Sequence, residues 1–401
     1  MGKYFDSAAI VNELYQECTG QAALDTIDNS NIVDIGTQIM AAWSTDNLVG
    51  KIYTKITETI VRNKVYEANS TFKGLYRTGK EYGNIIELLR VKHYEATSDP
   101  SFKPTNGATY DDFLKYEAPD YEATYIESKT GWQVKHWEPT YQLKEAFMSM
   151  ESMDKFLGAM GTAVINSINV RLEAMARDAL ANMIGEVAYS RGVANLPNNS
   201  YSNCVNLLKL YNDGPNAGGT PLTAAAAQND PEFIRFAITK MLIDRGRIST
   251  MSVLYNVNEV ETHTRPDDVR LTLLNTFSAK AKTYLYADTY HEELISGGLG
   301  ATNEVPYWQA SGDTDFDDTS ISSIDLKIKV PGSDTAQEVA LGGILGVMYD
   351  KDAVIVYNES RPAGAFYHPD LQQTRVYNKF AAGFANLLDS NFIVYFVADA
   401  T

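Results

Sequence analysis

The longest regular pattern of apolar positions in this chain lies between residues 149 and 189. Apolar side chains recur there in steps of three and four, the spacing of one face of an α-helix: Met153, Leu157, Met160, Val164, Ile168, Leu172, Met175 and Ala179. The opposite side carries two acid–base pairs at i, i+4 in the order that stabilises a helix: Glu151 with Lys155, and Glu173 with Arg177. At ~1.5 Å per residue the helix is roughly 60 Å long, much longer than average. The pattern therefore predicts an amphipathic rod, which a compact enzyme domain seldom needs.

The segment before this helix, from about residue 51 to residue 134, is rich in β-branched and aromatic residues. Turn-forming pairs interrupt it at Asp99-Pro100, Lys103-Pro104 and Asn106-Gly107, so it predicts a long β-hairpin. Residues 51–92 carry nine basic and four acidic residues, net +5, whereas residues 93–128 carry two and eight, net −6. Arms of opposite charge could pair with each other or with a neighbouring copy, or their charges could merely keep two strands solvated.

The segments after the helix predict a loop-rich stretch, a second helix and a C-terminal β core. Residues 192–230 are rich in Gly, Asn and Pro, which indicates loops. Pro231 after Asp230 fits the first turn of a helix. Residues 353–357 and 392–397 are near-continuous apolar runs, typical of buried strands, and the apolar residues between them have helical or long-strand spacing: Val376, Phe380 and Phe384. The fold class expected is α+β with mixed sheets.

Composition excludes several classes of protein. The chain has 401 residues, 44% of them hydrophobic, which is enough for a large core. Lys plus Arg is 34 and Asp plus Glu is 51, so the net charge of −17 is too acidic for a broad grip on nucleic acid. Cys18 and Cys204 alone build neither a disulfide framework nor a cysteine-rich metal site. No apolar run is long enough to span a bilayer, so we expect an intracellular protein without membrane contact.

Motifs that carry chemistry are incomplete. Residues 298–303 begin like a dinucleotide-binding loop but lack its third glycine, which favours an ordinary loop. Asp313, Asp315 and Asp317 have the spacing of calcium ligands, but the glycine and the final carboxylate of such a site are missing. We therefore assign no catalytic, cofactor-binding or metal-binding residue. A hydrolase with paired carboxylates stays an alternative, because such pairs come together only in the fold.

Tyrosines within the acidic arm of the predicted hairpin suggest a contact surface. Aromatic residues among acidic ones suit another protein rather than nucleic acid, unless the chain's own fold covers them: Tyr110, Tyr116, Tyr121 and Tyr125, among Asp111, Asp112, Glu117, Asp120 and Glu122.

The order of predicted elements resembles that of a known family. An extended N-terminal arm, a charged hairpin, a rod-like helix, a loop-rich excursion and a C-terminal β core follow one another in the major capsid protein of tailed bacteriophages, the Hong Kong 97-type fold that herpesvirus heads share. Short runs are similar to stretches of short-tailed, picovirus-type phages: residues 143–147 (LKEAF), 350–352 (DKD), 356–358 (VYN) and 384–386 (FAN).

The resemblance implies a domain plan. The expected parts are an N-terminal arm (1–72), an extension loop over the adjacent subunit (73–141), a peripheral domain (142–229) with a spine helix (149–189), an axial domain (230–340) and C-terminal strands that complete the peripheral domain (341–401). The hairpin residues expected at the assembly interface are Lys73, Arg77, Lys80, Tyr82, Arg90, Lys92, Tyr116, Asp120, Tyr121, Glu122 and Tyr125.

The function that the resemblance implies is structural, not enzymatic, and needs no cofactor. Identical subunits would assemble as pentamers and hexamers into the icosahedral or prolate shell that encloses packaged double-stranded DNA. Scaffolding protein, which the N-terminal arm would contact, and a portal are the expected partners, with assembly in the host bacterial cytoplasm and the virion as the final location. An encapsulin-type compartment is the alternative with the same fold, and the acidic hydrolase is the alternative of another class.

Overall fold

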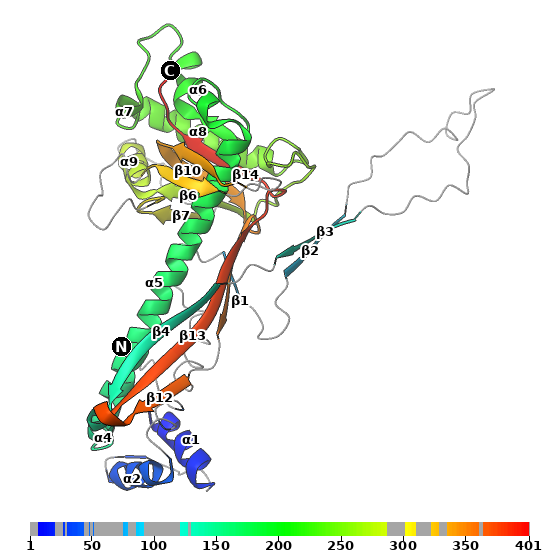
Figure 1. Cartoon of the computed structure of the whole chain (residues 1–401). Coiled ribbons are helices and arrows are strands. Elements are labelled where there is room, and N and C mark those ends of the chain that lie inside the picture. Colours follow the sequence, from blue (N-terminus) through cyan, green and yellow to red (C-terminus); the bar gives the residue numbers. More distant parts are fainter. Residues whose placement is uncertain are drawn as a thin grey trace, which may run out of the picture. The chain divides into compact units, whose positions relative to one another are not determined.

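A computed structural model describes residues 7–20, 27–28, 30–43, 48, 51, 75–78, 86–91, 121–126, 130–286, 301–309, 322–328, 335–360 and 364–400 (Figure 1). The chain divides into two units. The body comprises residues 1–81 and 129–401, and the hairpin unit comprises Tyr82–Ser128.

The predicted long helix is α5, Met150–Ser190, in the body. The Ser149 side chain caps its first turn by accepting a hydrogen bond from the Ser152 N–H at 3.1 Å. Both predicted ion pairs form on its polar side, at 2.7 Å for Lys155–Glu151 and 3.0 Å for Arg177–Glu173. The sequence therefore predicted both ends of the helix to within one residue.

One sheet lies along α5 and contains the predicted strand at residues 353–357 (Figure 1). Its long strand β13, Gln373–Asn386, pairs antiparallel on one edge with β4, Thr130–Pro139. Its other edge pairs with β11, Val354–Ser360, and then with β12, Gly364–His368. The short strand β1, Tyr76–Thr78, joins β11 in parallel. The spacing of Val376, Phe380 and Phe384 allowed either a helix or a long strand, and the structure shows the long strand.

A second sheet has the order β5-β14-β10-β6-β7. Its strands are β5 (Cys204–Asn206), β14 (Phe392–Phe396), β10 (Ile344–Asp350), β6 (Val269–Leu274) and β7 (Ala301–Val305). All five residues of β14 are buried, as its continuous apolar run predicts. Helices α6 (Leu207–Asp213), α7 (Ala224–Ala227), α8 (Pro231–Ile248) and α9 (Asn275–Tyr286) belong to the same part of the body.

The start of α8 follows the sequence prediction. Pro231 occupies the first turn, and the Asp230 carboxylate accepts a hydrogen bond from the Phe233 N–H at 2.8 Å. A further pair of strands, β8 (Ile324–Ile328) and β9 (Gln337–Leu341), packs on α5. Gly185 permits this contact, because a Cβ there would lie 3.2 Å from the Ile328 side chain.

Two loop predictions were wrong in part. Residues 192–230 contain a 3₁₀ turn, Val193–Asn195, together with β5, α6 and α7. In the run 298–303, the last three residues begin β7, which pairs in parallel with β6. Neighbouring strands, rather than local periodicity, define such short strands. Residues 298–300 and the aspartates of the run 313–317 lie outside the described residues.

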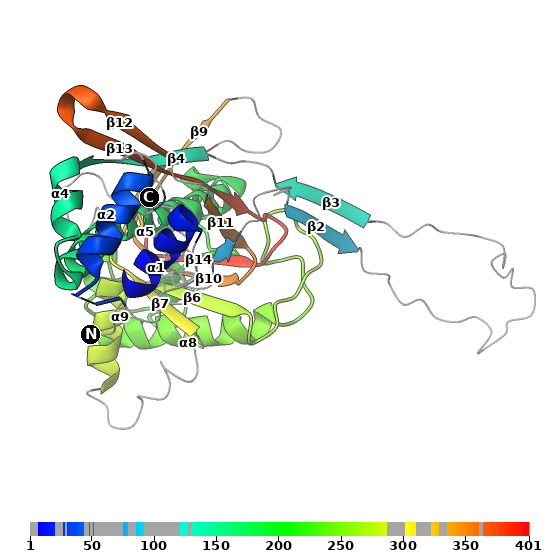
Figure 2. The ribbon, with the colours of Figure 1, turned by 90° about the horizontal axis from the view of Figure 1, so that it is seen from below.

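The N-terminal region is helical in its described parts, where the resemblance implies an extended arm. Helix α1, Ser7–Thr19, packs against α2, Ile32–Ala42, and against α5 (Figure 2). Gly36 of α2 lies on the Phe147 ring, where a Cβ would come within 2.5 Å of Cδ1. Burial of Ile32, Ile35 and Ile39 in the same core explains why this segment folds onto the body.

The hairpin unit contains strands β2, Ile86–Val91, and β3, Tyr121–Ile126. They pair antiparallel, with Ile86 opposite Ile126 and Arg90 opposite Glu122. The antiparallel pairing of these strands agrees with the predicted hairpin. None of the helices among the described residues is both long and apolar enough to cross a membrane.

Candidate intersubunit surfaces

The sheet formed by β4, β12 and β13 has one buried face and one exposed face. Side chains alternate along the strands, so the buried face of β13 holds Thr374, Val376, Asn378 and Phe380, all at most 4% exposed. Helix α5 covers this face, and the Asn386 side-chain amide donates to the Ala179 carbonyl of α5 at 3.2 Å. The opposite face therefore carries the side chains that the body leaves accessible.

Three residues form a row across the exposed face. Phe366 of β12 stands directly opposite Arg375 of β13, and Arg375 stands opposite Trp137 of β4. Phe366 is 60% exposed and Trp137 is 42% exposed. The Arg375 guanidinium lies 4.8 Å from the centre of the Trp137 ring and 5.2 Å from that of Tyr377. Two aromatic rings thus hold one arginine in place at the surface.

Two lysines add to the positive charge of this face. Lys135 of β4 and Lys379 of β13 are exposed and lie on the same face as Arg375, since all three occupy alternate positions of paired strands. Within the described part of the chain, no ion pair neutralises any of the three. We call these six residues, Lys135, Trp137, Phe366, Arg375, Tyr377 and Lys379, the aromatic–basic face.

The interface residues predicted from sequence are only partly placed. Arg90 lies in β2 and Tyr121, Glu122 and Tyr125 lie in β3, so the structure brings these four into one hairpin. Arg77 belongs to β1 of the body, where it stands opposite Tyr357 of β11. The other six, Lys73, Lys80, Tyr82, Lys92, Tyr116 and Asp120, lie outside the described residues.

Sequence reasoning missed the aromatic–basic face. Its signal was present as alternation in residues 133–138, where Gln, Lys and Trp alternate with Val, His and Glu. Residues 133–138 follow the two charged arms, 51–92 and 93–128, so the charge asymmetry of the predicted hairpin does not include them.

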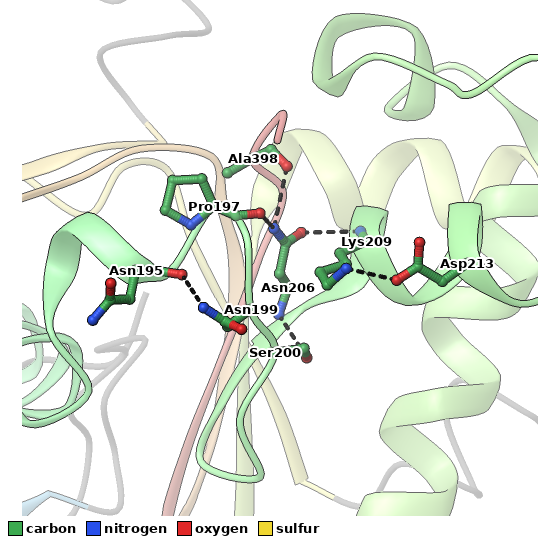
Figure 3. A network of polar contacts seen from close by, with 8 residues as sticks. All are labelled: Asn195, Pro197, Asn199, Ser200, Asn206, Lys209, Asp213 and Ala398. Carbon is green, nitrogen blue, oxygen red and sulfur yellow. Dashed lines mark hydrogen bonds and ion pairs between the residues drawn. The ribbon is translucent and has the colours of Figure 1, made fainter. Parts of the chain in front are cut away.

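A buried polar network fixes the C-terminal strand (Figure 3). Asn206 is completely buried, and its amide donates to the carbonyls of Pro197 at 3.0 Å and Ala398 at 3.2 Å. Its side-chain oxygen caps α6 by accepting from the Lys209 N–H at 3.3 Å. One asparagine therefore links β5, α6 and the end of the chain, and its role is structural.

Perturbed ionisable groups in the described part of the chain do not form a catalytic constellation. Burial raises the pKa of Glu186 to about 7, and its Oε2 has no hydrogen-bond partner. Burial also raises the pKa of the Cys204 thiol to about 12, so it stays protonated and unreactive. The buried Asp244 is paired with Lys240 at 2.5 Å and accepts from the Tyr395 hydroxyl at 3.2 Å. No group of three or more His, Cys, Asp or Glu among the described residues could hold a metal ion.

A spine helix on a long antiparallel sheet, a second sheet with its own helices and a separate hairpin define the Hong Kong 97-type capsid fold. The capsid structure of Staphylococcus phage Andhra shares this fold, with a TM-score of 0.50 and 12% identity over 80% of this chain and 82% of that one. A structure of the head fibre and inner core protein gp22 of bacteriophage P68 matches with a TM-score of 0.48 and 11% identity, over 82% of this chain and 84% of that chain.

The chain belongs to the Phi29-like phage major capsid protein family, whose model matches residues 8–396. It is therefore a capsid shell protein of tailed phages with a structural role, and the virion is its location. Membership of this family favours the phage shell over the encapsulin-type compartment and supports a structural role. No curated protein matches the chain.

Proposed function

We propose that the hairpin unit is the part of each subunit that overlaps the next one in the shell. The described part of this unit is a pair of six-residue strands, β2 and β3. A two-stranded hairpin is at best marginally stable by itself in water. A surface outside the hairpin unit must therefore stabilise it, and in a shell the adjacent subunit supplies that surface.

This proposal gives each expected segment a role. The extension loop runs over residues 73–141, with its ends in β1 and β4 of the sheet in the body. Residues 142–229 and 341–401 contribute α5 and the sheet along it to the peripheral domain, and residues 230–340 contribute to the axial domain that meets its copies in pentamers and hexamers. Strands β5, β10 and β14 pair with β6 and β7 in one sheet, so the two domains share strands across these sequence bounds. Residues 1–72 contact scaffolding protein during assembly.

The proposed shell is icosahedral or prolate, carries a portal and encloses double-stranded DNA, with assembly in the host cytoplasm. Net charge supports a lining that does not hold the DNA, because −17 on every copy weakly repels phosphates. No enzymatic activity and no cofactor enter this function.

Deletion of the hairpin unit tests the proposal. We replace Tyr82–Ser128 by a short Gly/Ser linker, which leaves β1 and β4 intact. The expected product is a folded subunit, with the circular dichroism and cooperative unfolding of the body, that forms no shells in electron micrographs. Intact shells from the deleted chain would show that the hairpin unit is not the overlapping part.

A further inference from the structure

The aromatic–basic face has a charge opposite to that of the whole chain. The chain carries 51 acidic and 34 basic residues, yet the face holds three basic residues and no carboxylate. The outward positions next to them on the same strands carry no carboxylate either: Gln133, Gly364, His368 and Gln373. Charged residues of both signs are normally interspersed on a protein surface. This unmixed cluster beside exposed rings therefore indicates a surface that binds an anion.

Salt screens this face from the acidic remainder of the chain. The Debye length is about 8 Å at physiological ionic strength. The basic residues spread over about 13 Å of β13, from Arg375 to Lys379 at ~3.3 Å per residue, and Lys135 stands opposite Tyr377 between them. Exposed charges farther away than the Debye length have little effect, so an anion at the face interacts chiefly with these three cations. A short anionic segment can therefore bind here, although the net charge of −17 opposes a broad grip on nucleic acid.

The geometry of Arg375 favours recognition of a planar anionic group. Its guanidinium lies 4.8 Å from the centre of the Trp137 ring and 5.2 Å from that of Tyr377, so both rings restrict it before a ligand arrives. A guanidinium binds phosphate or carboxylate through two parallel hydrogen bonds. A side chain that is already ordered loses less entropy on binding, which makes Arg375 the central contact of the face.

Two exposed rings beside Arg375 give the face more than charge. Phe366 of β12 and Trp137 of β4 stand on either side of Arg375 and are 60% and 42% exposed. Neighbouring strands lie about 4.8 Å apart, so the backbone positions of the two rings are roughly 10 Å from each other. Unpaired bases stack on exposed aromatic rings of a sheet, because every base has a flat face. An extended nucleic-acid strand can therefore place a base on each ring and a phosphate on the arginine between them.

We propose that the aromatic–basic face binds a short stretch of single-stranded nucleic acid. Unpaired bases stack on Phe366 and Trp137, and phosphates pair with Arg375, Lys135 and Lys379. Duplex DNA binds more weakly, because its bases are already stacked in pairs and only its phosphates reach the face. An acidic protein segment could also pair with the three cations. Protein partners usually anchor side chains in pockets, however, whereas a base needs only a flat ring such as those of this sheet.

Two variants of the full chain separate stacking from charge. The ring variant, Phe366→Leu/Trp137→Leu, keeps apolar side chains but removes both aromatic faces. The basic variant, Lys135→Gln/Lys379→Gln, removes two charges and keeps long side chains.

Each variant has a matched control outside the face. Lys155→Gln/Lys327→Gln changes the net charge as the basic variant does, at lysines that are 75% and 71% exposed and paired with acids of their own chain. Tyr189→Leu removes an exposed ring of α5, which is 39% exposed. Circular dichroism and cooperative urea unfolding like those of the parent chain show that each variant folds.

The readout is the fluorescence anisotropy of a labelled oligothymidylate of about twelve nucleotides, titrated with unassembled subunits at several salt concentrations. For the parent chain, we expect log K to fall with log salt at a slope of about −2, since three cations each contribute about −0.7. The ring variant should bind at least about tenfold more weakly at every salt concentration, with the slope unchanged. The basic variant should reduce the slope by about 1.4. Both controls should bind like the parent chain.

Four results would overturn the inference. They are no binding of the oligomer by parent subunits at low salt, unchanged binding by the ring variant, a duplex of the same length bound as tightly as the single strand, and a glutamate–tyrosine copolymer bound more tightly than the oligomer. The duplex result would leave a site for phosphates alone, and the copolymer result would assign the face to an acidic protein segment. The shell function does not depend on any of these results, because shells of the parent chain in electron micrographs test it separately.

Discussion

Removing the charge of Glu186 should make the stability of this subunit less sensitive to pH. Glu186 lies on α5 next to Gly185, the residue on which β8 packs, and its Oε2 is buried without a partner. Desolvation raises its pKa from 4.5 to about 7. Between these two values the folded state binds the proton and the unfolded state has lost it, so stability falls as pH rises.

The size of the effect follows from the two pKa values. Their difference of about 2.5 units corresponds to roughly 3 kcal/mol of destabilisation once the pH exceeds the folded pKa. Below about pH 4.5 the carboxyl is protonated in both states, so its ionisation then contributes nothing. From pH 5 to pH 8, ionisation of Glu186 is expected to lower the free energy of unfolding of the parent chain by about 2 to 3 kcal/mol.

The variant Glu186→Gln isolates the effect of this ionisation on stability, because an amide does not ionise. An amide buried without a partner has its own cost of about 1 to 3 kcal/mol, but this cost is the same at every pH. We therefore compare urea unfolding of unassembled subunits at pH 5 and pH 8, in the parent chain and in the variant. The exposed Glu145→Gln on α4 (Thr140–Ala146) is the matched control.

From pH 5 to pH 8, the free energy of unfolding of Glu186→Gln should rise by about 2 to 3 kcal/mol relative to that of the parent chain. The free energy of unfolding of Glu145→Gln should not change relative to the parent. If the free energies of the Glu186 variant and the parent differ by the same amount at both pH values, Glu186 is ionised in the folded subunit and the reasoning from burial is wrong.

Two further substitutions probe packing and the polar network. Gly36→Ala improves helix propensity by about 1 kcal/mol but places a Cβ 2.5 Å from the buried Phe147, so we expect the free energy of urea unfolding to fall by about 1 to 2 kcal/mol. Adding Phe147→Leu to the same chain should recover part of this loss. A higher free energy of unfolding for Gly36→Ala alone would contradict the close contact. Asn206→Ala leaves the carbonyls of Pro197 and Ala398 without their buried donor, for an expected loss of about 2 to 4 kcal/mol. Its amide hydrogen exchange should increase first in β14 and the residues after it, and unchanged protection there would refute the role of the network.

Sequence patterns predicted the parts of the fold that local physics determines. The stripe of α5 and its Ser149 cap lie within one stretch of chain, as do Asp230 and Pro231 at the start of α8. The apolar runs in β11 and β14 indicated burial without any knowledge of their partners. These elements have a single best conformation, because propensity, capping and burial all favour it.

The remaining features depend on pairing between distant segments. β5 has three residues, and its register with β14 depends on the buried Asn206, which no local pattern reveals. The row of Phe366, Arg375 and Trp137 exists only because β13 aligns strands that are far apart in the sequence. The local sequence gives no sign that these three residues are neighbours, because only the register of the paired strands places them side by side.

The energetics of the two units imply an order of events in assembly. The body has a contiguous core that includes α1, α2, α5 and both large sheets, so it has the burial needed to fold alone. The described part of the hairpin unit is a two-stranded sheet, which gains most of its stability only against a second surface. In the proposed overlap of subunits, each contact between a stable body and a marginal hairpin adds a modest free energy that can still be reversed. Shells built from such contacts correct misplaced subunits, whereas a hairpin that was rigid beforehand would bind its first neighbour too tightly to be released.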